Sequence, residues 1–579
     1  MAESRAPLRY TLRFPAPHTH YVEVEATVPT GQKPVVELAM AVWTPGSYLV
    51  REYARHVEGV TASTPDGQGL RLDKSRKNRW RIATNDAPDI TVTYRVYCRE
   101  MSVRTNWIDA GFALLNGAPT FLTLADDAPR PHDIQLVLPA SWHTSITGLP
   151  AVPGGAPHHY RAADFDTLVD SPILAGNPAI YPFEVDGIPH YLVNEGEGGM
   201  WDGPRAAQDV AKLVRAHRDM WGSLPYTKYV FFNMITESGG GLEHKNSTVL
   251  MTSRWHARVR KDYLAWLGLA SHEFFHVWNV KRLRPVELGP FDYENEVYTK
   301  NLWTAEGITS YYTDLGVRRA NLCTDDELLE RLSSMIERLQ TTPGRLVHPL
   351  EMASYDAWIK FYRTDENSAN TTISYYTKGA VVAFLLDVKI QSATAGTKRL
   401  DDVMRLAYTY YAGEQGFTRE EFRALASSVA GIDLRPWFIS VLETTEELDY
   451  TEALDWLGLR FRPAPSPTPE KAWLGLITRT DHNRLLVSQV HRHTPGWQDG
   501  FNVDDEMLAI DDYRVLPVQW EARLTQYQPG DHATILVARR ERLVRLAVTF
   551  GTEPPRRWIL ESDPGATTAQ RTHCTTWLA

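Results

Sequence analysis

The sequence is poor in cysteine. Only Cys98, Cys323 and Cys574 occur among 579 residues. They are odd in number and far apart, which favours free thiols in a reducing compartment over a disulfide framework. None lies in a CxxC pair or beside a histidine at ligand spacing, so we assign them no chemistry.

Long hydrophobic runs and blocks of one charge are also missing. The longest apolar run, at 380–386, is far too short to span a bilayer, and the N-terminus has no apolar stretch typical of a signal peptide. We therefore expect a cytoplasmic protein with no membrane partner, unless an upstream leader was removed. The net charge of −10 is spread without a basic run, which argues against a nucleic-acid partner.

The length and composition are those of a globular protein with several domains. The chain is 43% hydrophobic and 23% charged, and its length exceeds what one hydrophobic core usually serves. Residues 1–185 contain short alternating runs such as HYVEVEATV and ITVTYRVY, separated by turn sequences such as PDGQG. This pattern predicts an N-terminal, antiparallel, β-sandwich-like domain.

From about residue 190 the period becomes helical, so the overall class is multidomain α+β. We assign residues 186–462 to an α-rich domain, with helices expected at about 205–221, 260–282, 302–320, 325–340, 371–392, 399–411 and 418–429. The segment PAPSPTP at 463–469 predicts a stiff linker. Five short strands are expected within 470–555. Residues 556–579 are predicted to form a C-terminal extension or a poorly ordered end.

The strongest chemical signal is HEFFH at 272–276. On a helix, residues i and i+4 share a face, so His272 and His276 can point at one metal ion while Glu273 stands beside it. Zinc in a catalytic site takes such ligands and keeps one position for water. A carboxylate can then act as general base. The alternative is a buried helix with two hydrogen-bonded core histidines, but burying these groups without a shared partner is costly.

A third ligand is expected on a neighbouring helix. Glu306 lies in NLWTAEGITSYYTDL, close to the buried stripe formed by Ile308, Tyr312 and Leu315. A carboxylate in this position favours a cation partner. The alternative is a solvated glutamate near a helix N-terminus.

Two further segments have candidate substrate contacts. In GGGLEH (239–244), Gly240 and Gly241 would let the backbone lie close to a bound peptide, and Glu243 could pair with a cationic amine. In SYYTKG (374–379), a hydroxyl of Tyr375 or Tyr376 could donate to the oxyanion of the tetrahedral intermediate. The alternatives are an ordinary loop glutamate and core or surface tyrosines.

The four motifs in this order, GGGLEH, HEFFH, WTAEG and YYTKG, resemble those of the gluzincin metallopeptidases, and specifically the glycyl aminopeptidase family with its C-terminal PDZ domain. The resemblance implies a thermolysin-like catalytic domain, one zinc ion per chain, and removal of small N-terminal residues such as Gly or Ala from peptides with a free N-terminus. In the similar aminopeptidase N family, the Glu of a G-x-M-E-N segment binds the free amine of the substrate, and a Tyr followed by x-K-G is the oxyanion donor. This likeness implies the first role for Glu243 and the second for Tyr376.

The sequence departs from the related aminopeptidase N pattern at three places. The gap between His276 and Glu306 is longer, His244 replaces an asparagine, and Leu242 replaces a methionine. The connection between the two ligand helices must therefore be longer, and recognition of the amine is less firmly implied than binding of the metal.

The C-terminal module resembles a PDZ domain. The segment WLGL (473–476) is similar to the PDZ loop that receives a peptide C-terminus through backbone N–H groups. Asp504 stands where glycine is common, and Asp511-Asp512 replaces Asn-Gly. A module that serves only as a structural appendage is the alternative.

Three functions compete on the sequence. The leading one is a zinc aminopeptidase. The second is a zinc endopeptidase, in which Glu243 has no amine to bind. The third is a peptide-binding scaffold with a silent zinc site. The intact Glu273 argues against the third, while the oligomeric state is left open by the sequence.

Overall fold

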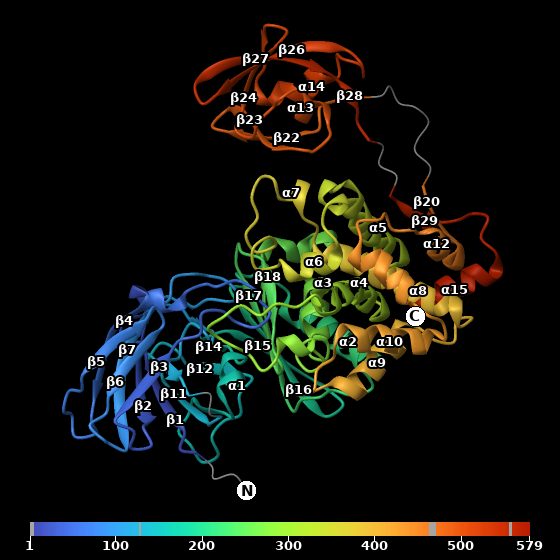
Figure 1. Cartoon of the computed structure of the whole chain (residues 1–579). Coiled ribbons are helices and arrows are strands. Elements are labelled where there is room, and N and C mark those ends of the chain that lie inside the picture. The colour runs from blue at the N-terminus through green and yellow to red at the C-terminus, as the bar shows by residue number, and fades with distance from the viewer. Residues whose placement is uncertain (1–4, 127–128, 463–470, 555–557) are drawn as a thin grey trace. The chain divides into compact units, whose positions relative to one another are not determined.

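The computed structural model describes residues 5–126, 129–462, 471–554 and 558–579 (Figure 1). The linker predicted at 463–469 lies outside these residues. The chain is a multidomain α+β protein with a β-rich N-terminal domain and a helical domain. It divides into two units: Met1–Thr299 with Tyr312–Cys323 and Asp401–Phe422, and Lys300–Tyr311 with Thr324–Leu400 and Arg423–Ala579.

The N-terminal part of the first unit consists of strands with one buried face. In β2 and β7 every second residue is buried, as the two-residue period of a strand requires. These strands belong to a six-stranded sheet, whose order is β13-β11-β1-β2-β7-β4. Its members are β1 (Leu8–Arg13), β2 (Tyr21–Pro29), β4 (Val57–Ser63), β7 (Asp89–Tyr97), β11 (His132–Val137) and β13 (His159–Ala162). The predicted antiparallel pairing holds except between β1 and β11, which are parallel.

Two four-stranded sheets complete this part. The first has the order β10-β3-β6-β5 and the second the order β12-β14-β9-β8. A hydrophobic core joins side chains from all three sheets, including Tyr10, Trp80 and Ile173. The strands are β3 (Val35–Ala39), β5 (Leu72–Arg76), β6 (Arg79–Ala83), β8 (Trp107–Ile108), β9 (Ala113–Leu115), β10 (Thr123–Leu124), β12 (Thr144–Thr147) and β14 (Ile173–Gly176).

A mixed five-stranded sheet follows in the chain, with the order β15-β16-β17-β19-β18. Strands β17 and β19 pair in parallel and are buried along their whole length. This burial is expected of parallel strands that are covered on both faces of the sheet. Helices α2 (Gly203–Trp221) and α3 (Arg260–Phe275) contact this sheet. Strand β18 forms one of its edges. The strands are β15 (Ala179–Val185), β16 (Ile188–Glu195), β17 (Tyr229–Ile235), β18 (Gly240–Glu243) and β19 (Ser247–Thr252).

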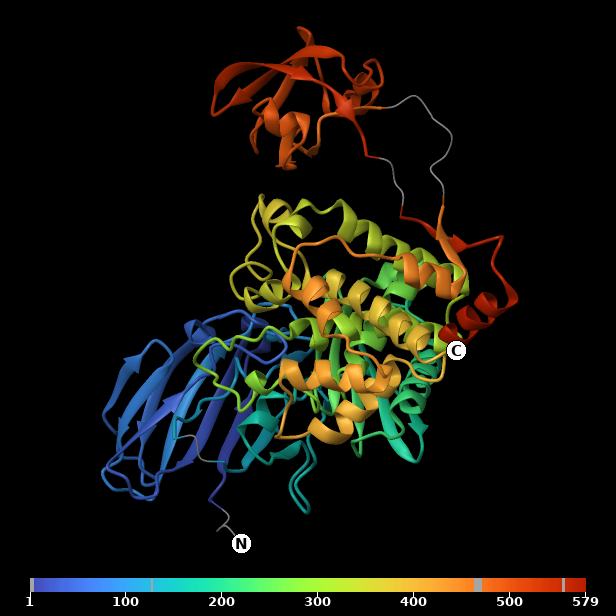
Figure 2. The ribbon, with the colours of Figure 1, turned by 45° about the vertical axis from the view of Figure 1, so that its right-hand side comes forward.

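The predicted helices are present, and two of them differ from expectation. The helix expected at 260–282 ends as α3 at Phe275, and the apolar pattern continues only because the turn after it, with Val277 and Trp278, is also buried. The helix expected at 302–320 begins with one π-helical turn, η5. The remaining main helices are η5 (Trp303–Gly307), α4 (Ile308–Arg319), α5 (Asp325–Thr341), α6 (Leu350–Tyr355), α7 (Ser368–Thr371), α8 (Tyr375–Ala393), α9 (Leu400–Tyr411), α10 (Arg419–Ala430), α11 (Arg435–Phe438) and α12 (Thr451–Leu457) (Figure 2).

All five strands predicted after the linker are present, and they form a separate sheet with the order β22-β23-β24-β26-β27. Its core contains Val487, Ile535 and Trp520. Strand β21 pairs with β28, and β25 pairs with β24. The elements are β21 (Ala472–Trp473), β22 (Leu476–Asp481), β23 (Arg484–Val490), α13 (Pro495–Gln498), β24 (Glu506–Ile510), β25 (Tyr513–Arg514), α14 (Trp520–Leu524), β26 (His532–Arg539), β27 (Arg542–Thr549) and β28 (Gly551–Thr552).

The C-terminal tail has regular structure, so the expectation of a poorly ordered end is wrong. Strand β29 (Leu560–Ser562) pairs with β20 (Leu459–Phe461), a strand that precedes the sheet domain. Helix α15 (Thr568–Leu578) then contacts α12. Its buried Trp577 donates an indole hydrogen bond of 2.7 Å to the Tyr311 hydroxyl. The tail was hard to predict because its few apolar residues make contacts distant in sequence.

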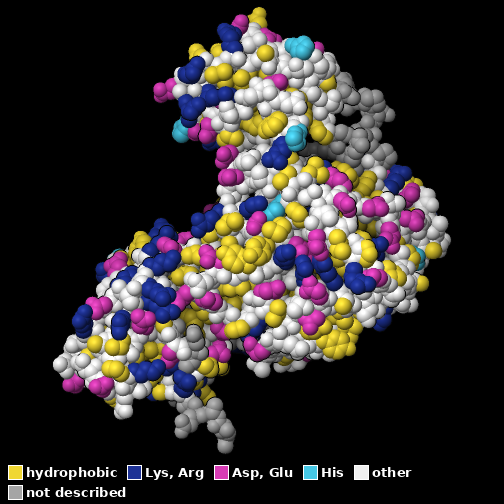
Figure 3. Space-filling view, viewed as in Figure 1, with side chains coloured by type: hydrophobic (Ala, Val, Ile, Leu, Met, Phe, Trp, Pro, Cys, Tyr) yellow, Lys and Arg dark blue, Asp and Glu magenta, His cyan; other side chains and the backbone are white. Residues whose placement is uncertain are grey.

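In the described part of the chain, no helix combines the length and the apolar character needed to cross a membrane. Acidic and basic side chains are mixed on the visible face of the N-terminal domain (Figure 3). The cytoplasmic location stays a prediction.

Two glycines explain why the third and fourth motifs both end in that residue. Gly307 ends η5 and Gly379 lies in the first turns of α8. A Cβ atom added to Gly379 would lie 2.8 Å from the Cα of Gly307, and one added to Gly307 would lie 2.6 Å from the Cα of Gly379. The backbones touch at this point, which fixes η5, and with it Glu306, against α8.

We predict that Gly379→Ala destabilises the protein although alanine is the better helix former by about 1 kcal/mol. Overpacking against backbone should cost about 1–3 kcal/mol and lower the apparent Tm by several degrees. Gly69→Ala is the control, since Gly69 is exposed and has open space around its Cβ position. Thermal unfolding followed by near-UV circular dichroism tests this, and equal Tm values for the two variants would contradict it.

Candidate active site

Both predicted imidazole ligands lie at the C-terminal end of α3. The helix has apolar residues on nearly every face and is buried over most of its length. His272 lies in its last turn and His276 is its C-cap. The spacing of four residues puts both rings on one face, and their Nε2 atoms are 3.2 Å apart.

Each imidazole is oriented by a contact at its other nitrogen. His272 Nδ1 lies 3.0 Å from the hydroxyl oxygen of Thr313, and His276 Nδ1 lies 2.9 Å from the carbonyl oxygen of Asn279. Because a carbonyl only accepts, the proton of neutral His276 is on Nδ1, and the lone pair that a metal would take is on Nε2. Such a contact selects the tautomer and ring orientation that a metal ligand needs.

Glu306 is held in the π-turn η5 and is 2% exposed. Such π-turns are frequent at functional sites. One ligand atom from each of His272, His276 and Glu306 can be chosen so that all lie within 4.8 Å of one another. Two imidazole nitrogens and one carboxylate oxygen fit the donor set of a catalytic zinc site with one position open. That His272, His276 and Glu306 are the metal ligands stays a prediction.

Glu273 follows the first histidine and is 5% exposed. Strand β18 lies against it, since a Cβ atom added to Gly241 would be 2.1 Å from Oε1 of Glu273. A side chain at this position would therefore displace the Glu273 carboxylate. The neighbouring Gly240 is exposed and has a φ of +109°. Both predicted glycines therefore lie on the edge strand, next to the predicted general base.

Glu243, at the end of β18, is close to His276 and Glu273. One ligand atom each from Glu243, Glu273 and His276 lie within 4.8 Å of one another. The Glu243 side chain is 4% exposed, and no hydrogen bond or ion pair joins it to any residue in the described ranges. A buried carboxylate without a partner is costly, so this group is a candidate for binding a cation supplied from outside.

The two predicted tyrosines begin α8, with Ser374 as N-cap. Tyr375 is fully buried, whereas Tyr376 is half-buried. The ring of Phe361 stacks on Tyr376, with centroids 5.2 Å apart. The greater exposure of the side chain favours Tyr376 over Tyr375 as the predicted oxyanion donor.

Two family models match this chain. The model of the Peptidase M61 N-terminal domain matches residues 9–177, and that of the M61 glycyl aminopeptidase matches residues 265–382. The chain belongs to the M61 glycyl aminopeptidase family. The second match includes the HEFFH, WTAEG and YYTKG segments. As a member of the M61 family, the protein is a peptidase.

Comparison with solved structures gives one match over the whole chain and two weaker ones. An aminopeptidase N family protein from Idiomarina loihiensis matches 99% of this chain and 100% of its own, with 28% identity and a TM-score of 0.91. Yeast LTA4 hydrolase matches 78% of this chain and 72% of its own, with 12% identity and a TM-score of 0.45. An M1 zinc metallopeptidase from Deinococcus radiodurans matches 77% and 95%, with 13% identity and a TM-score of 0.46. Comparison with curated proteins gives no significant match.

The M61 chain also contains a buried ionic group that sequence reasoning missed. Asp170 Oδ1 accepts from Lys281 Nζ at 2.6 Å and lies 3.1 Å from His244 Nδ1, and its other oxygen accepts the Lys245 N–H at 2.8 Å. These contacts fix the end of β18, next to Glu243. No local pattern announces Asp170, because its partners are about 75 and 110 residues away.

The charge of Asp170 is stabilised by these partners. Burial alone would raise its pKa, but the Lys281 ammonium and His244 outweigh burial, and the pKa of Asp170 lies well below its usual value. His244 therefore has a structural partner in this chain, which explains the replacement of asparagine in the motif.

We predict that Asp170→Asn lowers the free energy of unfolding by about 3–5 kcal/mol, because it leaves the Lys281 ammonium buried without an anion. The double variant Asp170→Asn/Lys281→Met removes both charges and should recover much of this loss. Denaturant unfolding of the four proteins forms a double-mutant cycle. A single variant as stable as wild type would refute the role of the pair.

The same pair predicts the pH dependence of stability. The folded-state pKa of Asp170 is depressed, so its contribution is complete above the unfolded value near 3.8 and is lost as the pH falls from there toward the folded pKa. The difference between wild type and Asp170→Asn should accordingly be constant near neutrality and shrink in acid.

Proposed function

We propose that the protein is a zinc aminopeptidase that removes small first residues, Gly or Ala, from peptides with a free N-terminus. One zinc ion per chain would be held by His272, His276 and Glu306. The observation that carries this proposal is the unpaired, buried carboxylate of Glu243 beside His276 and Glu273. A metal ligand group alone would serve any metallopeptidase, whereas an extra buried anion fits the α-ammonium group of a peptide.

The family match and the name of the M61 glycyl aminopeptidase model support this substrate class. We assign the chemistry to a thermolysin-like, gluzincin-type domain spanning residues 186–462. The donor set fits zinc because both Nε2 atoms face the same side and their Nδ1 atoms are held elsewhere. Zinc, when bound, would supply a Lewis acid that lowers the pKa of water and polarises the substrate carbonyl.

The chain's own residues supply the other steps. Glu273 accepts a proton from the attacking water and then delivers it to the leaving amine. Tyr376 donates a hydrogen bond to the oxyanion that develops on the substrate, with Tyr375 as the alternative donor. The edge of β18, with Gly240 and Gly241, pairs with the substrate backbone and sets its register. Glu243 then binds the ammonium group and stops longer peptides from extending past it.

The C-terminal sheet supports a PDZ-like module over residues 470–555. The loop containing Gly475 joins β21 to the edge strand β22, where a peptide could add as a further strand and place its carboxylate on the loop. Asp504, Asp511 and Asp512 have φ values of +66°, +47° and +67°, so the departures from the PDZ pattern keep the backbone region that glycine or asparagine would adopt. A purely structural module is the alternative.

Glu306→Ala and Glu273→Gln form a matched pair that separates the metal from the base. Glu306→Ala should lose zinc, measured by elemental analysis after dialysis, because a buried carboxylate ligand is missing. Glu273→Gln should keep zinc and lose about two to four orders of magnitude in kcat, because the amide cannot accept a proton. Unchanged zinc affinity in Glu306→Ala would show that this glutamate is not a ligand. Activity of Glu273→Gln within about tenfold of wild type would show that Glu273 is not the general base.

Glu243→Ala tests the aminopeptidase assignment. A charge-assisted contact contributes about 1.5–3 kcal/mol, so kcat/KM on alanine anilide should fall at least about tenfold. N-acetylated substrates carry no charge and should be affected much less. Glu237→Ala, an exposed glutamate between β17 and β18, is the control. If wild type cleaves free and blocked peptides equally, or Glu243→Ala weakens both alike, the enzyme is an endopeptidase. If wild type cleaves neither, the scaffold alternative stands.

A further inference from the structure

A small cavity of about 20 Å³ adjoins the Glu243 carboxylate. Its wall contains Trp43 and Tyr48 from the N-terminal β-rich part, and Leu288 and Phe291 from the segment after α3. Trp43, Tyr48 and Leu288 are buried, and Phe291 is half-buried. This volume is enough for about one water molecule, so the space beside the carboxylate is small.

Gly46 of the same N-terminal loop lies directly on the Glu243 carboxylate. A Cβ atom added to Gly46 would be 2.4 Å from Oε1 and 2.8 Å from Oε2. Its φ of +86° is also one that side-chain-bearing residues rarely adopt. Any substitution at Gly46 must therefore push the carboxylate away from its present position.

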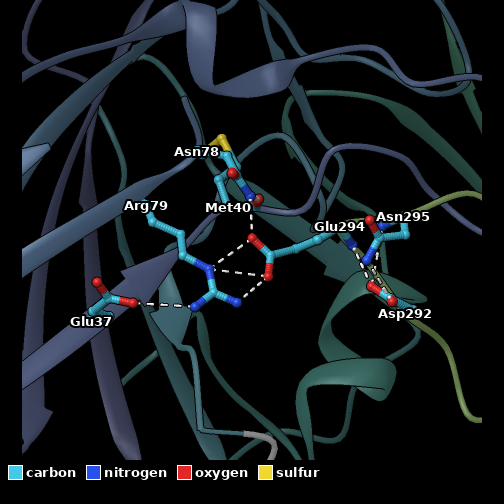
Figure 4. Close-up of polar contacts among 7 residues, drawn as sticks. All are labelled: Glu37, Met40, Asn78, Arg79, Asp292, Glu294 and Asn295. Carbon is cyan, nitrogen blue, oxygen red and sulfur yellow. Dashed lines mark hydrogen bonds and ion pairs between the residues drawn. The ribbon is translucent and has the colours of Figure 1, made fainter. Parts of the chain in front are cut away.

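The two segments that line the cavity, around Trp43 and around Phe291, are joined by hydrogen bonds. The Trp43 indole donates a 2.7 Å hydrogen bond to the Asp292 carbonyl, and the Val42 N–H donates one of 2.8 Å to the Tyr293 carbonyl. Figure 4 shows a second set of contacts between the same two parts of the chain. Glu294 accepts a hydrogen bond of 2.8 Å from Asn78 and further ones from the Arg79 guanidinium. Hydrogen bonding to Arg79 lowers the pKa of Glu294, so this ion pair persists well below neutral pH.

The cations near the cavity do not neutralise Glu243. Lys281 pairs with Asp170, and Arg284 pairs with Glu414 and lies over the Phe291 ring, 5.7 Å from its centroid. No ion pair joins either cation to Glu243 within the described ranges. Val280, which also lines the cavity, has a φ of +88°, a strained value for a β-branched residue that is typical of functional sites.

We propose that Trp43, Tyr48 and Phe291 form the wall that limits the first residue of the substrate to Gly or Ala, and that Gly46 positions the Glu243 carboxylate at this wall. This inference rests on the proposed aminopeptidase function and adds the residues that set the specificity. The N-terminal domain is then part of the substrate site rather than a separate appendage. Size selection arises because a larger side chain would have to displace these rings, of which Trp43 is held by its hydrogen bond to the Asp292 carbonyl.

The first experiment compares kcat/KM on glycine, alanine and leucine anilides. Phe291→Ala should raise the leucine-to-alanine ratio at least about tenfold, since a pocket discriminates between side chains differing by a few methylenes by about 10–200-fold. Phe291→Leu, a milder change, should raise it less and serves if the first variant folds poorly. Phe183→Ala is the control, because Phe183 is half-buried in β15 and does not line the cavity.

The second experiment tests Gly46. Gly46→Ala should raise KM for alanine anilide at least about tenfold, the loss expected when the Glu243 contact is broken. Gly67→Ala is the matched control, since Gly67 has a φ of +89° and open space around its Cβ position. Both variants have the same backbone strain, and only Gly46→Ala displaces the carboxylate. Equal effects in the two variants would overturn the positioning role of Gly46.

The outcomes separate this inference from the proposed function. If wild type fails to hydrolyse the free-amine anilides, the aminopeptidase proposal itself fails. If wild type hydrolyses them but Phe291→Ala and Phe291→Leu keep the wild-type leucine-to-alanine ratio, the wall does not set specificity and the aminopeptidase proposal stands. A wild-type preference for leucine over alanine would also show that the aromatic residues do not limit the size of the first residue.

Discussion

Burial of several carboxylates around two imidazoles is the constraint on which this structure depends. Glu243, Glu273 and Glu306 are each at most 5% exposed, and burying a charged group without a partner costs several kcal/mol. The fold therefore has to supply either partners or a place where partners bind. The tautomer of His276, the π-turn that holds Glu306 and the close approach of β18 to Glu273 all follow from the way the chain meets this requirement.

Much of the site could be predicted from the sequence because its spacing is local. The i, i+4 histidine pair, the glutamate between them and the glycines of β18 are each recognisable in a short segment. Glu306, the predicted third ligand, is also recognisable, since it interrupts an apolar helical pattern. The half-buried position of Tyr376 and the full burial of Tyr375 could not be predicted. The exposure of these side chains depends on Phe361 and other residues that are distant in sequence.

Other parts could not be predicted for the same reason. Asp170 and Gly46 belong to the N-terminal region, and no periodicity relates them to β18. The parallel pairing of β1 with β11 joins segments about 120 residues apart, whereas the alternating pattern reports only that strands exist and which face is buried. The helix pattern after Phe275 misled because buried turns and buried helices have similar composition. Whether residues 470–555 are PDZ-like, and where the domain boundaries fall, stay predictions.

The pairing of β20 with β29 changes how the C-terminal sheet domain should be regarded. The two strands lie on either side of it in the chain, with Leu459 opposite Ser562 and Phe461 opposite Leu560. Residues 472–552 are therefore an insertion within the helical part, not an appended tail. Truncation before the sheet domain would also remove the partner strand of β20 and the Trp577 contact to Tyr311. Gain or loss of such a module during evolution would have to occur by exchange of an internal segment, joined at both ends.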